Sequence, residues 1–288
     1  PLTLGLICKF IRRSNTKILF NIQDMFPDNA KFLGIIKSSI VYNFYKKIEK
    51  ISIDNADKVF LHSKGNLKYL ANQYPNLSNK MDVILNWANY EKKLEKYQKN
   101  YNVVANENNG IKIIFAGISG PAQDLISLLP FFKLLKLNNF KVNFDFFIEG
   151  RQKDKLVELV KINKLNKMIK INELIDRNKY LTILSKYDIG LVVLSDKNKT
   201  PTIPGKCIDY MIAGIPILSF SNRESDLNDY LSLSKSGFNC VSNNPNEMMR
   251  VLLKFYDNRK NIELMGKNGL TFLKEKLKVE IAYNKLFK

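Results

Sequence analysis

The sequence TPTIPGKCIDYMIAGIPILSF, residues 200–220, carries the signals of a helix followed by a buried strand. A Pro-Gly turn precedes a predicted helix over 206–213, and Gly214 ends that helix before an apolar strand. Lys206 and Asp209 are three residues apart and therefore lie near one face of the helix. Lys206 and the helix amides can hold phosphate oxygens there, and Asp209 can accept hydrogen bonds from a ribose diol. Ordinary helix-capping charges are the alternative interpretation.

Outward from this segment, apolar runs alternate with helical stretches, which is the pattern of a parallel sheet covered by helices on both faces. We expect strands at 17–22, 58–61, 82–85, 111–116, 143–148, 168–171, 189–194 and 216–220. We expect helices at 1–14, 35–53, 63–73, 124–137, 154–161, 180–186 and 206–213, with a helical tail from 245 onwards. The sequence therefore predicts an α/β protein with one complete doubly wound domain and one partial domain.

The polar stretch 91–110 has no apolar alternation and is interpreted as a linker. We expect a partial N-terminal domain with this linker over 1–103 and a C-terminal domain over 104–265. A helical tail over 266–288 is expected to return to the N-terminal domain.

The amino-acid composition excludes several classes of function. With 45% apolar and 25% charged residues in 288, the chain can bury a large core. Three widely spaced cysteines give no disulfide framework, and a single histidine, His62, excludes a histidine-rich metal site. We interpret His62 as structural. The net charge of +19 is spread along the chain. Codon choice in an AT-rich genome, which favours lysine, is one explanation for it. No basic run is interleaved with aromatic residues, so we expect no nucleic-acid partner, whereas an anionic membrane or a phosphate-bearing substrate suits a diffuse positive field.

Two further loops follow predicted strands, where open α/β sheets bind their ligands. The first contains Gly117, Gly120 and Gln123, and its glycines allow a ligand to approach the backbone. The second is Glu149-Gly150-Arg151, in which a cation follows the glycine. A simple turn and a solvated helix start are the alternative interpretations.

Six segments together resemble family 4 glycosyltransferases. IPGKCIDYMIAGIPIL resembles the donor-site pattern P-x-K-x-x-E-Y-x-A-x-G-x-P, and NIQDMFPD (21–28) resembles the QDLWPE segment of the branch that adds amino sugars to bacterial surface polysaccharides. The other four are ADKVFLHSKGNLKYL (56–70), VILNWAN (83–89), FAGISGPAQDL (115–125) and YDIGLVVL (187–194), in the family's order and spacing.

The resemblance implies a GT-B fold of two facing Rossmann-like domains, with the active site between them. It implies retaining transfer of a hexose or N-acetylamino sugar from a nucleotide diphosphate, UDP above all, to a lipid-linked or growing surface glycan. No metal or other cofactor is expected, and the implied location is cytoplasmic, at the inner face of the inner membrane. The implied catalytic residues are Lys206 and Asp24, the latter in the acceptor-side loop. The implied donor-binding residues are Gly117, Gly120, Gln123, Glu149, Gly150, Arg151, Pro204, Gly205, Lys206 and Asp209.

The sequence also departs from the family pattern. Pro201 stands where many members carry a glutamate that contacts the donor sugar, so Asp196 or a backbone amide would have to replace it. Ile118 stands where many members carry an arginine, which leaves Lys206 and Arg151 to neutralise the diphosphate. About the first hundred residues of a typical member have no counterpart, so we expect an N-terminally incomplete chain or one half of a split enzyme.

Two other functions stay open. One is a nucleotide-sugar 2-epimerase, which uses a similar two-domain fold, and the other is a non-catalytic nucleotide-sugar-binding fragment or subunit. The basic amphipathic helices at 1–14 and 35–51 can lie on an anionic membrane or pack into the core.

Overall fold

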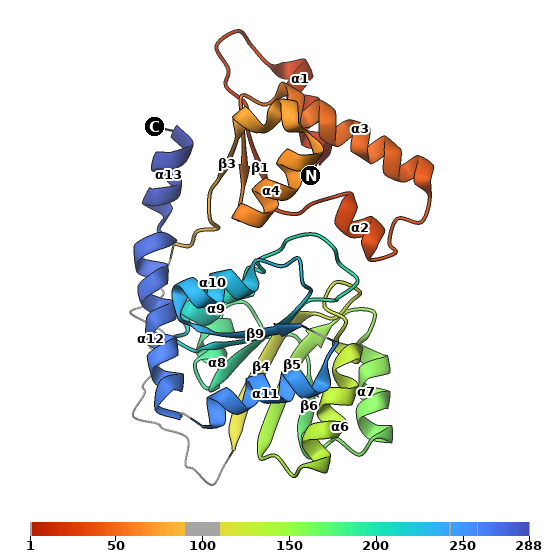
Figure 1. The fold of residues 1–288 in the computed structure, drawn as a ribbon, viewed down its shortest axis with the longest axis vertical. Helices are drawn as coiled ribbons and strands as arrows, with labels where there is room; N and C mark the ends of the chain where they lie inside the picture. The colour runs from red at the N-terminus through yellow and green to blue at the C-terminus, as the bar shows by residue number, and fades with distance from the viewer. Residues whose placement is uncertain (1, 90–109, 242, 258, 288) are drawn as a thin grey trace.

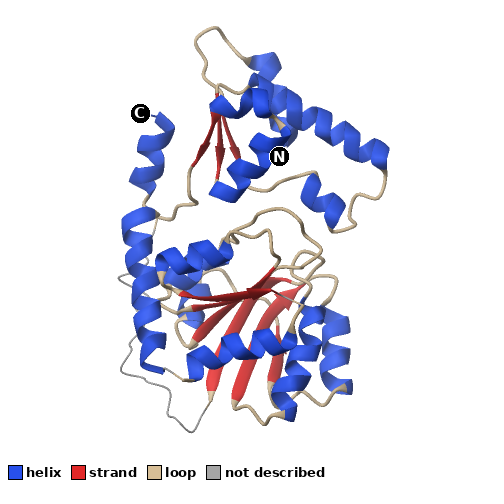
Figure 2. Cartoon of the chain, viewed as in Figure 1, coloured by secondary structure: helices blue, strands red, loops and turns tan. Residues whose placement is uncertain are grey.

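The computed structural model describes residues 2–89, 110–241, 243–257 and 259–287. Within them the chain forms two parallel sheets, each covered by helices, one above the other in Figures 1 and 2. This confirms the predicted α/β class. The expected linker 91–110 falls almost entirely outside the described residues, and the expected domain boundaries stay predictions.

The larger sheet has six parallel strands in the order β6-β5-β4-β7-β8-β9. Their bounds are β4 Ile111–Ile118, β5 Val142–Glu149, β6 Ile169–Asn172, β7 Ile189–Val193, β8 Ile217–Ser221 and β9 Gly237–Val241. The chain builds outward from β4 to β6 and then returns to the other side of β4. The strand order therefore reverses between β4 and β7, and in such sheets ligands bind beside this point, beyond the carboxyl ends of the strands.

Helices cover both faces of this sheet because its strands are apolar on both sides. Ile113 and Phe115 of β4 belong to the core cluster on one face, and Ile114 belongs to the cluster on the other. The covering helices are α6 Leu129–Leu137, α7 Lys153–Ile162, α8 Tyr180–Leu184, α9 Lys206–Ile212, α10 Leu227–Ser234, α11 Pro245–Tyr256 and α12 Arg259–Lys276.

The smaller sheet has three parallel strands, β1 Leu19–Ile22, β2 Lys58–Leu61 and β3 Met81–Val83, in that order. Its helices are α1 Leu2–Ile11, α2 Asp28–Phe32, α3 Ser39–Asn55, α4 Lys64–Gln73 and the 3-10 helix η1 Pro75–Lys80. Helices α1 and α3 pack closely because α1 has a glycine at their crossing. A Cβ on Gly5 would lie 2.2 Å from Ser52 Oγ.

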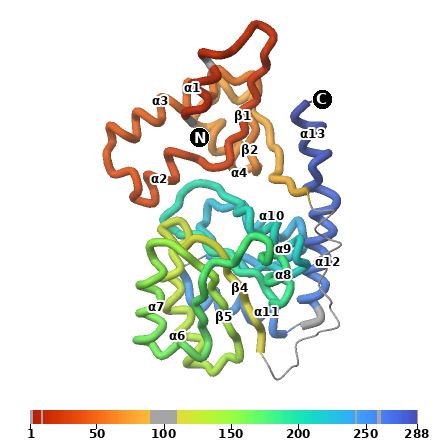
Figure 3. Tube along the Cα trace, turned by 180° about the vertical axis from the view of Figure 1, so that it is seen from behind, coloured from red at the N-terminus to blue at the C-terminus, as the bar shows by residue number. Residues whose placement is uncertain are grey.

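The end of the chain runs along both sheets (Figures 1 and 3). Helix α12 packs against the larger domain through Phe272 and Leu273. Helix α13 (Val279–Phe287) packs against the smaller one, where Ala282 joins a buried cluster with Phe60. No helix within the described residues has the length and apolarity needed to cross a lipid bilayer.

The structure corrects several predicted elements. The helix expected at 35–53 begins at Ser39, because the Ser38 side chain accepts from Val41 N and caps it. The helix expected at 124–137 is divided into the 3-10 turn η3 (Leu125–Leu128) and α6, with Pro130 in the first turn of α6. Helices α2 and α10 and strand β9 were not predicted.

A buried polar cluster holds α2 against α3 and α4. The Asp28 carboxylate, at the start of α2, accepts hydrogen bonds from Tyr42 of α3 at 2.8 Å and from Tyr69 and Gln73 of α4 at 2.9 and 2.8 Å. Lys46 Nζ lies 3.5 Å from the same carboxylate. Burial raises the pKa of Asp28, but these hydrogen bonds and the Lys46 charge outweigh it and hold the pKa below its usual value.

Replacing this carboxylate should destabilise the N-terminal domain. We expect Asp28→Ala to lower the free energy of unfolding by about 3 kcal/mol, because three partly buried hydrogen bonds and the nearby Lys46 charge lose a buried acceptor. A lowered carboxyl pKa stabilises the fold above the unfolded pKa, so the difference from wild type should narrow as the pH falls below about 4. Urea unfolding at several pH values measures both effects.

The matched control is Asp54→Ala, an exposed carboxylate in the last turn of α3. It should change the free energy of unfolding by less than about 0.5 kcal/mol. Equal losses in the two variants would contradict a role for the buried cluster.

Candidate functional site

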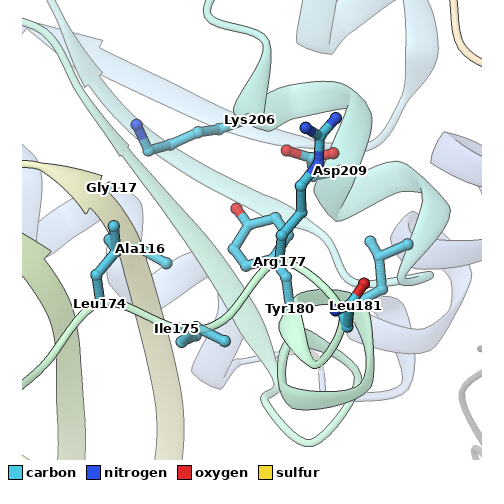
Figure 4. Close-up of a pocket in the computed structure, with 10 residues that line it drawn as sticks. Ala116, Gly117, Leu174, Ile175, Arg177, Tyr180, Leu181, Lys206 and Asp209 are labelled. Carbon is cyan, nitrogen blue, oxygen red and sulfur yellow. The ribbon is translucent and has the colours of Figure 1, made fainter.

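A cavity of about 840 Å³ opens at the carboxyl end of β4, beside the point where the strand order reverses (Figure 4). Three segments form it: the end of β4, the loop after β6 with the start of α8, and α9. The lining residues are Ala116, Gly117, Leu174, Ile175, Arg177, Asn178, Tyr180, Leu181, Lys206 and Asp209. Its volume suits a nucleotide-sized ligand.

Lys206 reaches this cavity across the backbone of Gly117. A Cβ on Gly117 would lie 2.7 Å from Lys206 Nζ, and the residue has a φ of +144°, which side chains rarely adopt. The ammonium also lies 4.9 Å from the centroid of the Phe115 ring. Glycine at 117 is therefore what allows the lysine to lie over the end of β4.

The side chain of Lys206 is partly removed from water. Burial lowers the pKa of its ammonium, and the nearby Asp209 carboxylate opposes that change. No ion pair joins Lys206 to a carboxylate within the described ranges. A desolvated cation at a cavity wall is costly to the empty protein and favours an anionic ligand.

Asp209 lines the same cavity one turn further along α9. Burial and the Asp209 charge together raise the pKa of Tyr180 above its usual range, so this phenol is neutral and can donate a hydrogen bond. Asp209 also borders a second cavity of about 550 Å³, together with Gly205 and with Trp87 of residues 84–89, the interdomain segment that follows β3. Cys207, which stands between Lys206 and Asp209 in α9, is fully buried in the core, and burial raises the pKa of its thiol to about 12.

Comparison with known proteins identifies the fold of the chain. No family model matches the chain. It is 23% identical over 235 residues to a protein named probable glycosyltransferase WbjE from Pseudomonas aeruginosa, an alignment that covers 80% of this chain and 58% of that protein. The chain thus spans less than two thirds of the length of this curated relative.

Solved structures match almost the whole chain. HepE from Anabaena, in complex with UDP, matches with a TM-score of 0.73 and 12% identity over 99% of this chain and 74% of that one. Sucrose-phosphate synthase from Thermosynechococcus elongatus matches with a TM-score of 0.72 and 15% identity over 99% and 70%. The chain has the GT-B fold. This confirms the fold and the glycosyltransferase resemblance expected from the sequence.

Within this GT-B fold, the predicted donor residues fall into two groups. Gly117, Lys206 and Asp209 line the large cavity together, and Pro204 and Gly205 lead into α9 directly before Lys206. Gly120, Gln123, Glu149, Gly150 and Arg151 are not among its lining residues.

The second group forms a pair of loops that pack against each other. Ser119 N donates to the Glu149 carbonyl at 2.6 Å, and a Cβ on Gly150 (φ +116°) would lie 2.3 Å from the Ser119 carbonyl oxygen. Glycine at 150 thus allows the two loops to touch. The expected contact of these residues with a nucleotide stays a prediction.

Sequence reasoning missed the third segment of the cavity, the loop after β6. Arg177 and Asn178 come from this loop, and Tyr180 begins α8. The available signal was positional: a loop after a parallel strand of this sheet belongs at the ligand-binding edge. The loop has neither a glycine nor a motif to mark it.

The acceptor-side prediction, Asp24, lies in the N-terminal domain and is not among the residues that line the large cavity. It borders a separate cavity of about 490 Å³ beside β1, together with Gln23, Phe26 and Tyr45. His62, at the end of β2, is 4% exposed, and neither ring nitrogen has a hydrogen-bond partner within the described residues. Burial lowers the pKa of His62, and the negative charges of Asp24 and Asp226 oppose this.

Asp196, considered above as a replacement for the missing glutamate, accepts a hydrogen bond from Asn243 at 2.9 Å and does not line the large cavity. No group of three or more His, Cys, Asp or Glu side chains in the described part of the chain could hold a metal ion. The expectation of metal-free transfer stays a prediction.

The electrostatic coupling of Lys206 and Asp209 is measurable without a ligand. Because the Asp209 charge raises the pKa of Lys206, we expect Asp209→Asn to lower that pKa further. The pKa of Lys206 can be measured by NMR titration of the lysine Cε and Nζ resonances, which are assigned with Lys206→Arg. Asp124→Asn is the control, because Asp124 bonds Gln152 outside the cavity lining and should leave the Lys206 titration unchanged. An unchanged Lys206 pKa in Asp209→Asn would refute the coupling.

Proposed function

We propose that the large cavity binds a nucleoside diphosphate sugar, and that the protein is a retaining glycosyltransferase. The observation that carries the proposal is Lys206, a half-buried cation that lies over Gly117 and lacks an ion-pair partner in the described structure. The diphosphate supplies the missing negative charge. Asp209, on the same face of α9, accepts hydrogen bonds from the ribose hydroxyls.

In the proposed reaction, the bond between the sugar anomeric carbon and the diphosphate oxygen breaks, and a bond to an acceptor oxygen forms. Negative charge grows on the departing diphosphate as the first bond lengthens. Lys206 stabilises that charge most strongly because the site is partly shielded from water. Asp24 orients the acceptor hydroxyl from the facing domain, and the proton of that hydroxyl passes to the departing diphosphate oxygen as the new bond forms.

The donor is UDP linked to a hexose or an N-acetylamino sugar, and the acceptor is a lipid-linked or growing surface glycan. HepE, which shares this fold, was solved with UDP and with UDP-glucose. WaaG, another structural neighbour, is described as a glycosyltransferase involved in lipopolysaccharide biosynthesis. The sequence motifs quoted above support the same class of substrates.

Calorimetric titration with UDP, GDP and ADP tests the donor site. We expect UDP to bind, and we expect Lys206→Ala to weaken binding about tenfold or more, since a charge-assisted contact contributes roughly 1.5–3 kcal/mol. Lys155→Ala, which removes an exposed lysine paired with Glu158 on α7, is the matched control and should bind like wild type. Absence of nucleotide binding by the folded chain, or equal binding by Lys206→Ala, would contradict the proposal.

Product analysis distinguishes a transferase from the two alternative functions, a nucleotide-sugar 2-epimerase and a non-catalytic nucleotide-sugar-binding fragment or subunit. A transferase releases UDP only when an acceptor is glycosylated, whereas an epimerase returns an isomerised UDP-sugar. A non-catalytic subunit binds UDP and releases no product.

The acceptor class also implies contact with a membrane surface. Four apolar side chains of α1, Leu4, Ile7, Phe10 and Ile11, are more than half exposed. Arg12 and Arg13 follow them directly, so apolar and cationic groups lie together as in helices that bind anionic bilayers.

Vesicle sedimentation tests this contact. We expect binding to phosphatidylglycerol vesicles, less binding to phosphatidylcholine vesicles, and several-fold weaker binding of Phe10→Glu. Leu137→Glu, which changes an exposed apolar residue of the C-terminal domain, is the control. Equal binding of Phe10→Glu and wild type would exclude α1 as the contact.

A further inference from the structure

The first turn of α4, in the N-terminal domain, is hydrogen-bonded to two loops of the C-terminal domain. Gly65 N donates to Asp226 Oδ2 at 3.0 Å, and Asn66 Nδ2 donates to the Pro201 carbonyl at 2.8 Å. These pairs are 161 and 135 residues apart in the sequence. These two hydrogen bonds join the GT-B domains directly. They involve neither the interdomain segment nor the C-terminal helices α12 and α13.

Asp226 caps a helix of the other domain instead of its own. It occupies the position before α10, yet its side chain makes no capping bond to α10. Its carboxylate lies at the start of α4, where backbone N–H groups favour a negative charge. The fit requires glycine, since a Cβ on Gly65 would lie 2.3 Å from Asp226 Oδ1.

Asn66 is fully buried, and both ends of its side-chain amide are bonded. The oxygen accepts from Ser63 Oγ at 2.6 Å within α4, and the nitrogen donates to Pro201 across the domain boundary. The Ser63 hydroxyl oxygen also caps α4 by accepting from Asn66 N at 3.0 Å. The hydrogen bond to Pro201 therefore replaces the water that this amide nitrogen would contact if the domains were apart, and it contributes to the docked arrangement as an ordinary buried hydrogen bond does.

Pro201 begins the segment that leads to the proposed donor site. Four residues separate it from Lys206. The same segment is held from the C-terminal domain by Ser225, whose hydroxyl donates to the Thr202 carbonyl at 2.7 Å. The segment before Lys206 is therefore bonded by both domains.

We propose that Asn66 and Asp226 are positioning residues that couple docking of the two domains to the donor site. Asn66 fixes Pro201 and, through the short segment 202–205, the start of α9 with Lys206. Asp226 holds the first turn of α4 in the place from which Asn66 reaches Pro201. This inference rests on the proposed function of the large cavity.

Asn66→Asp isolates the coupling. Aspartate keeps the acceptor for Ser63 but replaces the interdomain donor with an oxygen that faces the Pro201 carbonyl. Asp226→Asn is the second variant, because it removes the charge at the start of α4 and keeps a side chain of the same shape. Asn55→Ala is the matched control: its amide donates to the Ile51 carbonyl at 2.7 Å, within one helix of the N-terminal domain.

Two measurements on the full chain test whether Asn66 and Asp226 couple domain docking to the donor site. Thermal unfolding checks that each variant is folded. Calorimetry should show UDP binding weakened about fivefold or more by Asn66→Asp, as loss of one buried hydrogen bond predicts, and by less than twofold in Asn55→Ala. Small-angle X-ray scattering should show a larger radius of gyration for Asn66→Asp and Asp226→Asn than for wild type and Asn55→Ala.

Wild-type UDP affinity and an unchanged radius in folded Asn66→Asp and Asp226→Asn would overturn the coupling. If Lys206→Ala still weakens UDP binding in that case, the donor site stands and only the coupling fails. If wild type binds no UDP, the proposed function fails, and the scattering arm still decides whether Asn66 and Asp226 hold the domains together.

Discussion

Helix α9 can present Lys206 and Asp209 to the cavity because Tyr210 fixes that helix on the sheet. The Tyr210 ring lies against the backbone of β7, where a Cβ on Gly190 would come within 2.4 Å of it. The ring is fully buried, and its hydroxyl donates to the Leu191 carbonyl at 3.0 Å. A buried, hydrogen-bonded aromatic ring prevents rotation of the helix about its axis, so the residues beside Tyr210 keep a constant direction. A side chain at position 190 would lift the helix and move both polar groups.

A second glycine, at the end of β4, forms the part of the cavity wall that faces α9. Gly117 leaves room for the Lys206 ammonium at the end of β4, next to the Phe115 ring. The protein thus holds a desolvated cation near the strand-order reversal, at an energetic cost that an anionic ligand removes. The interdomain contact of Asn66 with Pro201 acts on the same helix from its N-terminal side. The donor site, the sheet and the domain interface therefore share one short segment, residues 201–210.

Much of this could be predicted from local sequence. Strand β2 has its predicted bounds, and α4 begins directly after Ser63, because a run of apolar residues and a capping serine are local signals. The joint placement of Lys206 and Asp209 followed from helical spacing alone. Strand β9 was not predicted because its residues GFNCV lack alternation, and its glycine is explained only by the neighbouring strand: a Cβ on Gly237 would lie 1.9 Å from the Ile217 carbonyl oxygen. Arg177 and the Asn66–Pro201 contact depend on which loops meet in space, which no local pattern encodes.

The proposed function requires that the cavity over Gly117 holds the diphosphate of a nucleotide sugar. A crystal structure of the protein with UDP tests it most directly. We expect diphosphate oxygens within hydrogen-bond distance of Lys206 Nζ and ribose hydroxyls hydrogen-bonded to the Asp209 carboxylate. A bound UDP whose diphosphate lies away from Lys206, or whose ribose contacts neither Asp209 nor the loop after β6, would contradict it.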